Sequence, residues 1–270
     1  MLKTLRDAFR IKDIRTKIFY TLMMMVVIRL GSQLPVPGVD RNYFANWFAS
    51  QQSNGAFNFF SAFTGGSFEK MSIFALNITP YITSSIIMQL LTIAIPQLEE
   101  MQRDGEDGRK KIQNITRFVT VGLAVFESLA MSIGFGRSGL LEHFNFLSVL
   151  TVVVALTAGT AFLMWTGERI TEKGVGNGIS IVLVINIISR VPQDIATLIE
   201  QFVKPQTIAK GALALIIIIA IILLTIVMVI ILNDATRKIP VQYAKKMQGR
   251  RLVGGQSSNI PLKVNTAGVI

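Results

Sequence analysis

The stretch Ser72–Leu91, which reads SIFALNITPYITSSIIMQLL, constrains the fold more than any other part of the chain. It is an apolar helix that carries a proline, an asparagine and several hydroxyl side chains. The segment Ala56–Met71 before it is broken by two glycines and is too short to cross a bilayer, because a spanning helix needs roughly 20 apolar residues. Polar groups and broken backbone survive at membrane depth only where protein or a water-filled cavity receives them. We therefore expect a helix that lines an aqueous path, with a re-entrant segment beside its outer mouth.

The composition places the chain among membrane proteins. Of its 270 residues, 51% are hydrophobic and 16% are charged, whereas soluble domains carry roughly 25% charged residues. The predicted fold class is an all-α, polytopic transmembrane helix bundle that forms a single membrane domain over residues 1–270. A seventh apolar run starts at Leu262–Ile270, so we expect the start of a seventh span and a longer parent protein. The six expected spans are Ile18–Leu34, Ile73–Ile95, Ile115–Phe135, Phe146–Trp165, Ile179–Ser189 extending towards Leu198, and Gly211–Leu232.

The positive charges predict an orientation. In a six-span arrangement the tail 1–17 and the loops 96–117, 166–178 and 233–263 lie on one side, with 20 Lys and Arg, while the opposite loops hold six. Loops rich in Lys and Arg stay in the cytoplasm, so the amino terminus is expected there. A nucleic-acid-binding protein would instead gather its basic residues on a soluble domain.

Two segments resemble the signatures of the SecY family, the protein-conducting channels of cell membranes. The first is Ser72–Leu91, and the second is Trp165–Val182, which reads WTGERITEKGVGNGISIV. The carboxyl-terminal LKVNTAGVI is also similar to the family. Asn77 departs from the family pattern, which usually has glycine at that position.

The second of these segments has a physical explanation of its own. Its glycines permit positive φ in a tight connection between two helices, and Asn177 can cap the helix that follows. Phosphate binding by this turn is disfavoured, because no Lys-Ser/Thr follows it and no strand precedes it. We interpret the turn as structural.

The resemblance implies the function of the chain. It would be the amino-terminal part of a ten-helix channel, the central subunit that moves unfolded polypeptides across the membrane and releases apolar segments sideways into lipid. Such a channel is not an enzyme and needs no cofactor or metal. The implied location is the bacterial inner (plasma) membrane. The implied partners are SecE-like and SecG-like small membrane subunits, the motor ATPase SecA, the ribosome, signal peptides and nascent chains, and membrane lipid.

The resemblance also assigns an apolar pore ring and a plug. Ile78 and Ile82 share one helical face at four-residue spacing, and with Leu183 they would form the ring; lipid contact or core packing would give the same spacing. A hydrophobic constriction blocks ions by dewetting. The segment 56–74 would be the plug, although an ordinary re-entrant loop would look the same in sequence. Its assigned residues are Phe59, Phe60, Gly65, Gly66 and Phe68.

Two further sites follow from the same resemblance. A lateral gate would include Thr83, Gln89 and Asn265. The cytoplasmic loop 233–263 would dock the ribosome and SecA, although a basic loop also serves as a topology signal and a contact for anionic lipid. The docking residues are Lys245, Lys246, Arg250 and Arg251.

Two other classes of function compete with the channel. A secondary transporter also uses broken helices at the membrane midplane, but it would need a richer set of buried charges than Glu127 and Arg29. A membrane enzyme would need an acidic or histidine cluster at one face, and the sequence contains none. Arg29 can snorkel to the outer interface. Glu127 faces a cavity, pairs with Arg29 or is protonated, and the sequence leaves these alternatives open.

Overall fold

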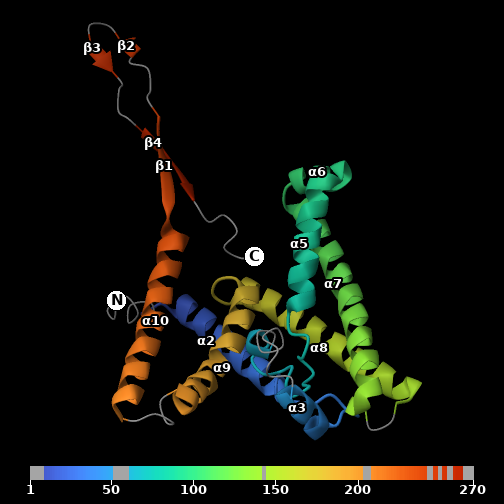
Figure 1. Ribbon diagram of the computed structural model, residues 1–270. Coiled ribbons are helices and arrows are strands. Elements are labelled where there is room, and N and C mark those ends of the chain that lie inside the picture. The colour runs from blue at the N-terminus through green and yellow to red at the C-terminus, as the bar shows by residue number, and fades with distance from the viewer. Residues whose placement is uncertain are drawn as a thin grey trace. The chain divides into compact units, whose positions relative to one another are not determined.

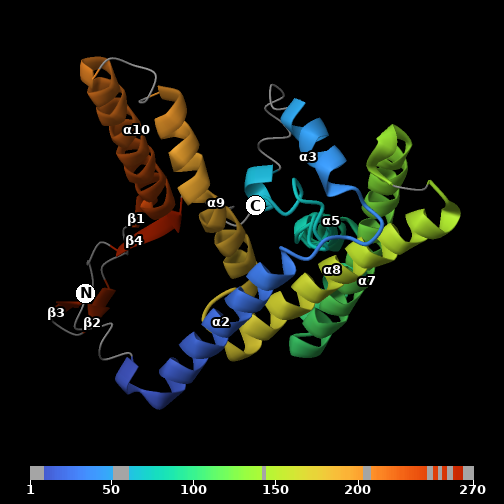
Figure 2. The same cartoon turned by 90° about the horizontal axis from the view of Figure 1, so that it is seen from below.

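The computed structural model describes residues 9–50, 61–141, 144–202, 208–241, 246–248, 251–253 and 258–263. The chain divides into two compact units, Met1–Gln193 and Asp194–Ile270. In the first unit, α7 packs along both α5 and α8, and α2 packs along α8 (Figures 1 and 2). The elements of this unit are α2 (Lys12–Gly31), α3 (Arg41–Ser50), α5 (Thr79–Ala94), α6 (Pro96–Arg103), α7 (Glu106–Phe135), the π-helical turn η1 (Gly136–Leu140), α8 (Phe146–Lys173) and most of α9 (Gly178–Phe202).

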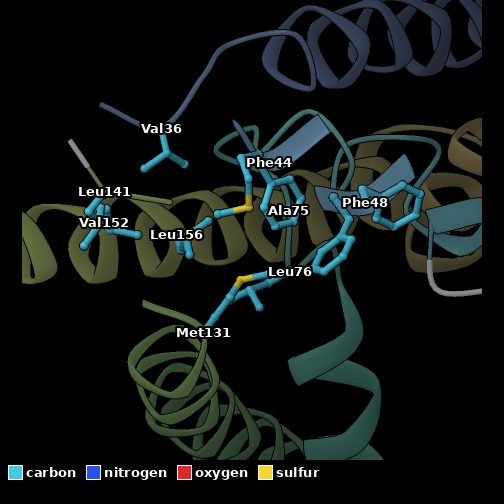
Figure 3. Packing of buried hydrophobic residues seen from close by; sticks show 11 residues of the cluster. Val36, Phe44, Phe48, Ala75, Leu76, Met131, Leu141, Val152 and Leu156 are labelled. Atoms are coloured by element: carbon cyan, nitrogen blue, oxygen red, sulfur yellow. The ribbon is translucent and has the colours of Figure 1, made fainter. Parts of the chain in front are cut away.

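One apolar cluster fills the space between α3, α7, α8 and the chain that leads into α5 (Figure 3). Phe44 and Phe48 of α3 are both buried, and the ring of Phe44 meets that of Phe68 edge-on, with 5.5 Å between centroids. Met131 of α7 and Leu156 of α8 complete the cluster. The sequence analysis did not predict α3, whose aromatic side chains hold the segment after residue 60 in place.

Helix α5 begins later than the predicted span Ile73–Ile95. Its first residue is Thr79, with Pro80 in the first turn, and residues 73–78 form turns. Proline lacks an N–H and its ring clashes with the carbonyl four residues earlier, so it is tolerated in the first turn and not further inside. Asn77 has a φ of 53°, outside the helical region. The Ser72–Leu91 stretch is therefore not one continuous helix.

Length and composition identify candidate spans among the helices. Within the described ranges, four helices are long and apolar enough to cross a membrane: α7, α8, α9 and α10 (Ile208–Asp234). The pair α5 and α6 qualifies together but is bent by 101°. The bend falls at Ile95, which is extended because the proline after it disfavours the helical conformation. Helix α2 is 20 residues long but carries Arg15, Lys17 and Arg29.

The second unit corrects the all-α prediction. After α10, the chain forms antiparallel strands β1 (Thr236–Val241) and β4 (Ser258–Lys263), in which Thr236 pairs with Lys263 and Val241 with Ser258. The shorter strands β2 (Lys246–Gln248) and β3 (Arg251–Val253) form a second antiparallel pair farther from α10 (Figure 1). The basic loop 233–263 is thus a two-tiered β-hairpin, because each half of the loop supplies a partner for the backbone of the other half.

Candidate functional site

Helix α5 presents two different polar faces. Ser84 is fully buried against α7, where its hydroxyl lies 2.9 Å from the Thr116 carbonyl oxygen and 2.7 Å from the Thr120 hydroxyl oxygen. Small hydroxyl residues allow close helix packing in membranes. Thr83 and Gln89 lie on an exposed face, and the Thr83 hydroxyl donates back to the Thr79 carbonyl. Of the lateral-gate residues, Asn265 lies outside the described residues.

A second apolar cluster surrounds the amino end of α5. Ile78 is fully buried in it with Ile28 of α2, Leu163 of α8 and Val182 of α9. The two other residues assigned to the ring, Ile82 and Leu183, pack against this cluster and stay half-buried. The fold therefore brings the three predicted ring residues into one apolar neighbourhood. Only Ile82 and Leu183 keep side-chain surface that could line a path.

The segment 61–77 is a buried, irregular connection rather than a loosely attached loop. Phe68 is buried in the first cluster, and the backbone N–H of Val36 donates to the Met71 carbonyl at 3.0 Å. Ile73 N–H donates in turn to the Leu34 carbonyl at 3.0 Å. Phe59 and Phe60, the other aromatic residues assigned to the plug, lie outside the described residues. The described part of this segment is held by both side-chain packing and backbone hydrogen bonds.

The two glycines of the segment have positive φ, 63° for Gly65 and 78° for Gly66. The sequence analysis assigned both of them to the plug. Gly65 also allows a close approach, because a Cβ there would lie 2.5 Å from the Asn186 carbonyl oxygen of α9. A larger residue at this position would push the segment off α9.

Polar side chains join this segment to α9, and the sequence analysis missed their role. Asn186 Nδ2 donates to Asn77 Oδ1 at 2.8 Å, and both side chains are buried. Asn77 Nδ2 donates to the Phe63 carbonyl at 3.1 Å. One turn further along α9, Arg190 forms an ion pair with Glu69 at 3.2 Å and donates to the Ser61 hydroxyl. An asparagine and an arginine within an apolar helix were the available sequence signal.

The glycine-rich turn between α8 and α9 confirms one local prediction. Asn177 Oδ1 accepts from the Ile179 N–H at 3.0 Å, which caps α9 as expected. Gly176 has a φ of 74°, a conformation that glycine adopts without steric cost. The turn also docks on α2, because Val175 N–H donates to the Thr21 hydroxyl at 3.1 Å. It is a structural connection between three helices.

Charged residues elsewhere in the first unit divide into paired and unpaired groups. Glu168 of α8 accepts from Arg117 of α7 at 2.7 Å, which ties the two helices together. Arg29 and Glu127 do not form an ion pair with each other, and Arg29 Nη1 is buried without a hydrogen-bond partner among the described residues. The pairing alternative for Glu127 is therefore wrong within this structure.

Two of the four docking residues of the basic loop, Lys246 and Arg251, are described, and both lie on its outer tier. Lys246 begins β2 and Arg251 begins β3, and Gln248 pairs with Arg251 across the hairpin. Lys245 and Arg250 lie outside the described residues. Nearer to α10, Arg237 and Lys238 of β1 are exposed. The fold thus separates basic residues of the outer tier from those of the inner tier.

These features define a polytopic helical membrane protein whose central helix is polar on two sides and apolar at its amino end. The sequence profile of the SecY family matches residues 72–270, and the chain belongs to that family. It is 44% identical to the protein translocase subunit SecY of Halalkalibacterium halodurans and 42% identical to that of Streptomyces scabiei. Each alignment covers the whole chain and 63% of the relative. The chain thus spans about two thirds of the length of these relatives.

Solved structures share the fold. A protein-conducting channel superposes with a TM-score of 0.58 at 17% identity, covering 92% of this chain and 52% of the channel. Sec61 from the canine ribosome–channel complex of the endoplasmic reticulum gives a TM-score of 0.56 at 16% identity, covering 84% and 49%. At these identities the likeness concerns the arrangement of the helices alone.

Proposed function

We propose that this chain belongs to the central subunit of a protein-conducting channel that moves unfolded polypeptides across the bacterial inner membrane and releases apolar segments into lipid. The proposal rests on the surroundings of α5, in a chain that belongs to the SecY family. Ser84 of α5 makes its hydrogen bonds to α7, Thr83 and Gln89 are exposed outside that contact, and an apolar cluster surrounds the amino end of the helix. Polar side chains exposed on a membrane helix need water or protein opposite them.

The proposed topology has six spans and the start of a seventh, with the amino terminus in the cytoplasm. It counts α2 and the bent pair α5–α6 as spans beside α7, α8, α9 and α10. The distribution of 20 Lys and Arg against six supports the orientation. Thr83, Gln89 and Asn265 are proposed to line a lateral gate through which apolar segments leave.

The proposed pore ring uses Ile82 and Leu183, with Ile78 packed behind them. Both keep exposed surface while packing on the second apolar cluster. The segment 56–74, of which residues 61–74 are described, is proposed to be the plug over this ring. In a structurally similar SecY protein (TM-score 0.55, 20% identity, 92% of this chain and 52% of that one), the plug domain stabilises the closed state of the translocation channel and maintains a membrane seal.

The proposed partners are SecE-like and SecG-like small membrane subunits, the motor ATPase SecA, the ribosome, signal peptides, nascent chains and lipid. The outer tier of the basic hairpin supports a cytoplasmic docking role, because Lys246 and Arg251 begin its two paired strands. Contacts to ribosomal phosphates would be electrostatic and salt-dependent.

Transport in proteoliposomes tests the proposal. A channel of full family length that contains this chain would be reconstituted with the small subunits, SecA and ATP. We expect a secretory precursor to become protected from protease in a manner that depends on its signal peptide. A precursor that stays fully accessible, while a related channel protects it in parallel, would contradict the proposal. Uptake of a small solute instead would favour the secondary transporter.

A further inference from the structure

The segment 61–77 meets the rest of the molecule through two chemically different sides. Its apolar side, which includes Phe68, Met71 and Leu76, packs in the first apolar cluster. Its other side meets α9 through polar groups at Asn186 and Arg190, next to the second apolar cluster, in which Phe74 of the segment lies with Val182 of α9. Polar and charged groups in a membrane protein are costly and face protein or water rather than lipid. This polar contact therefore needs an explanation beyond packing.

The polar groups of α9 form one stripe that continues from the apolar cluster. Leu183, Asn186 and Arg190 are spaced three and four residues apart, so they share one face of the helix. The partner of Asn186 is Asn77, which directly precedes Ile78 of the same cluster. Both partners of this contact thus lie next to a residue of the proposed ring or its cluster: Asn77 precedes Ile78, and Asn186 follows Leu183 by three residues.

The contact has two layers. In the inner layer Asn186 donates to Asn77 at 2.8 Å, and Asn77 donates to the Phe63 carbonyl at 3.1 Å. In the outer layer Arg190 pairs with Glu69 at 3.2 Å and also donates to Ser61. The Arg190 side chain is 16% exposed and that of Glu69 is 34% exposed. The ion pair is partly shielded from water, so the loss of one partner leaves a poorly solvated charge.

The inner layer is satisfied only in part. Asn186 Oδ1 is buried and accepts no hydrogen bond among the described residues. A buried unsatisfied acceptor is destabilising, whereas an acceptor in contact with water is not. Apolar contacts weaken when water enters, but these polar groups gain water partners when they separate. The contact is consequently stable while water is excluded. Its partners can separate once water enters the path beside it.

We propose that Asn186 and Arg190 form a polar lock that holds the segment 61–77 over the Ile82–Leu183 ring through Asn77 and Glu69. This inference rests on the proposed channel function. It adds the residues that keep the channel closed at rest. They are positioning residues, because they hold the segment and do not touch the polypeptide in the closed state. Opening requires both layers to separate.

A thiol-labelling experiment tests the lock without requiring transport. The chain contains no cysteine, so Ser67→Cys, at a buried position within the segment, gives a single label site within residues 1–270. The channel of full family length carries Ser in place of any cysteine in its remaining part. The probe is a water-soluble maleimide, and the readout is the labelling rate of the resting channel. Ion conductance of the same channel without the label in a planar bilayer is the second readout.

The lock predicts a specific pattern across variants. Arg190→Gln and Glu69→Gln should each raise the labelling rate and the resting conductance about tenfold, as loss of one partner of a shielded ion pair implies. The charge swap Glu69→Arg with Arg190→Glu should return both values at least halfway to wild type. Asn186→Leu should raise both, because it leaves Asn77 without its partner. Arg137→Gln, which removes an exposed positive charge elsewhere, should change neither.

Two outcomes would overturn the lock. One is unchanged labelling and conductance in both single charge variants. The other is a swap that labels as fast as the single variants although thermal unfolding shows that it is folded. Because labelling is measured at rest and without substrate, a wild-type channel that transports no polypeptide would refute the proposed function while leaving this measurement interpretable.

Discussion

At the residue scale, Ser84 makes a buried polar contact between two helices. Its hydroxyl lies within hydrogen-bond distance of Thr116 and Thr120 of α7. Interhelical hydrogen bonds in membranes contribute on average about 0.6 kcal/mol, with a maximum near 1.7. We therefore expect Ser84→Ala to lower the free energy of unfolding by about 1 kcal/mol. Thermal unfolding in detergent measures this effect, and Ser85→Ala, at a partly exposed neighbour, is the control.

Asn77 shows why a residue that departs from the family pattern can still fit the fold. Its φ of 53° lies in the left-handed region, which glycine adopts freely and asparagine tolerates better than other residues. Asn77→Ala and Asn77→Gly both remove the hydrogen bonds to Asn186 and Phe63. Only alanine adds a backbone penalty of about 1–2 kcal/mol. We expect Asn77→Ala to unfold at a lower temperature than Asn77→Gly, and equal midpoints would contradict the assigned backbone conformation.

The same residues show how far the site was predictable. The Asn177 cap acts on a residue two positions away, and the sequence alone predicted it correctly. The Asn77–Asn186 and Glu69–Arg190 contacts join residues 109 and 121 positions apart, respectively. Such pairs depend on how the helices pack, which local patterns do not encode. Only the family resemblance predicted that Ile78, Ile82 and Leu183 lie close together.

At the element scale, the presence of a helix was easier to predict than the residues at which it begins and ends. Long apolar runs indicated α7 to α10, but α7 and α8 extend beyond those runs into charged sequence, because helical hydrogen bonding continues in water. Pro80 and Asn77 move the start of α5 to Thr79. The strands of the hairpin were missed, because β1 and β4 are short and exposed and each carries a proline.

The hairpin supports a prediction about docking. Replacing both Arg250 and Arg251 with Glu (the outer-tier variant) should weaken binding of SecA or the ribosome, since it reverses charge at the first residue of β3 and at the residue before it in the sequence. With 20 positive charges on that side of the proposed topology, orientation should not change. Binding measured at low and high salt tests this, because an electrostatic contact weakens as salt rises.

The matched control for this prediction lies on the inner tier of the same hairpin. Arg237→Glu with Lys238→Glu makes the same change in charge at exposed positions of β1. We expect it to reduce binding much less than the outer-tier variant. Equal losses in the two variants would mean that net charge, rather than the position of the charges, governs the association. Binding that matches wild type in the outer-tier variant would leave the loop as a topology signal.

At the scale of the whole molecule, much apolar and polar surface has no partner within the described chain. The most apolar 18-residue stretch of α10 is 0% buried within the structure. Thr83 and Gln89 of α5 are exposed on the side away from α7. In the membrane, lipid can cover α10, but polar groups that face hydrocarbon cost several kcal/mol each unless water or protein receives them. The exposed face of α5 therefore requires a wet path or another part of the channel.

This requirement leads to a prediction for the 270-residue chain, which spans 63% of its relatives. Reconstituted by itself with the small subunits and SecA, it should give no signal-dependent transport, because a ring and gate built on one side cannot close around a polypeptide. Supplying the remaining third of a SecY relative as a separate polypeptide should restore protease protection of a secretory precursor. Separate expression controls for each piece show that both insert into the membrane. Robust transport by the 270-residue chain alone would show that residues 1–270 form a working pore.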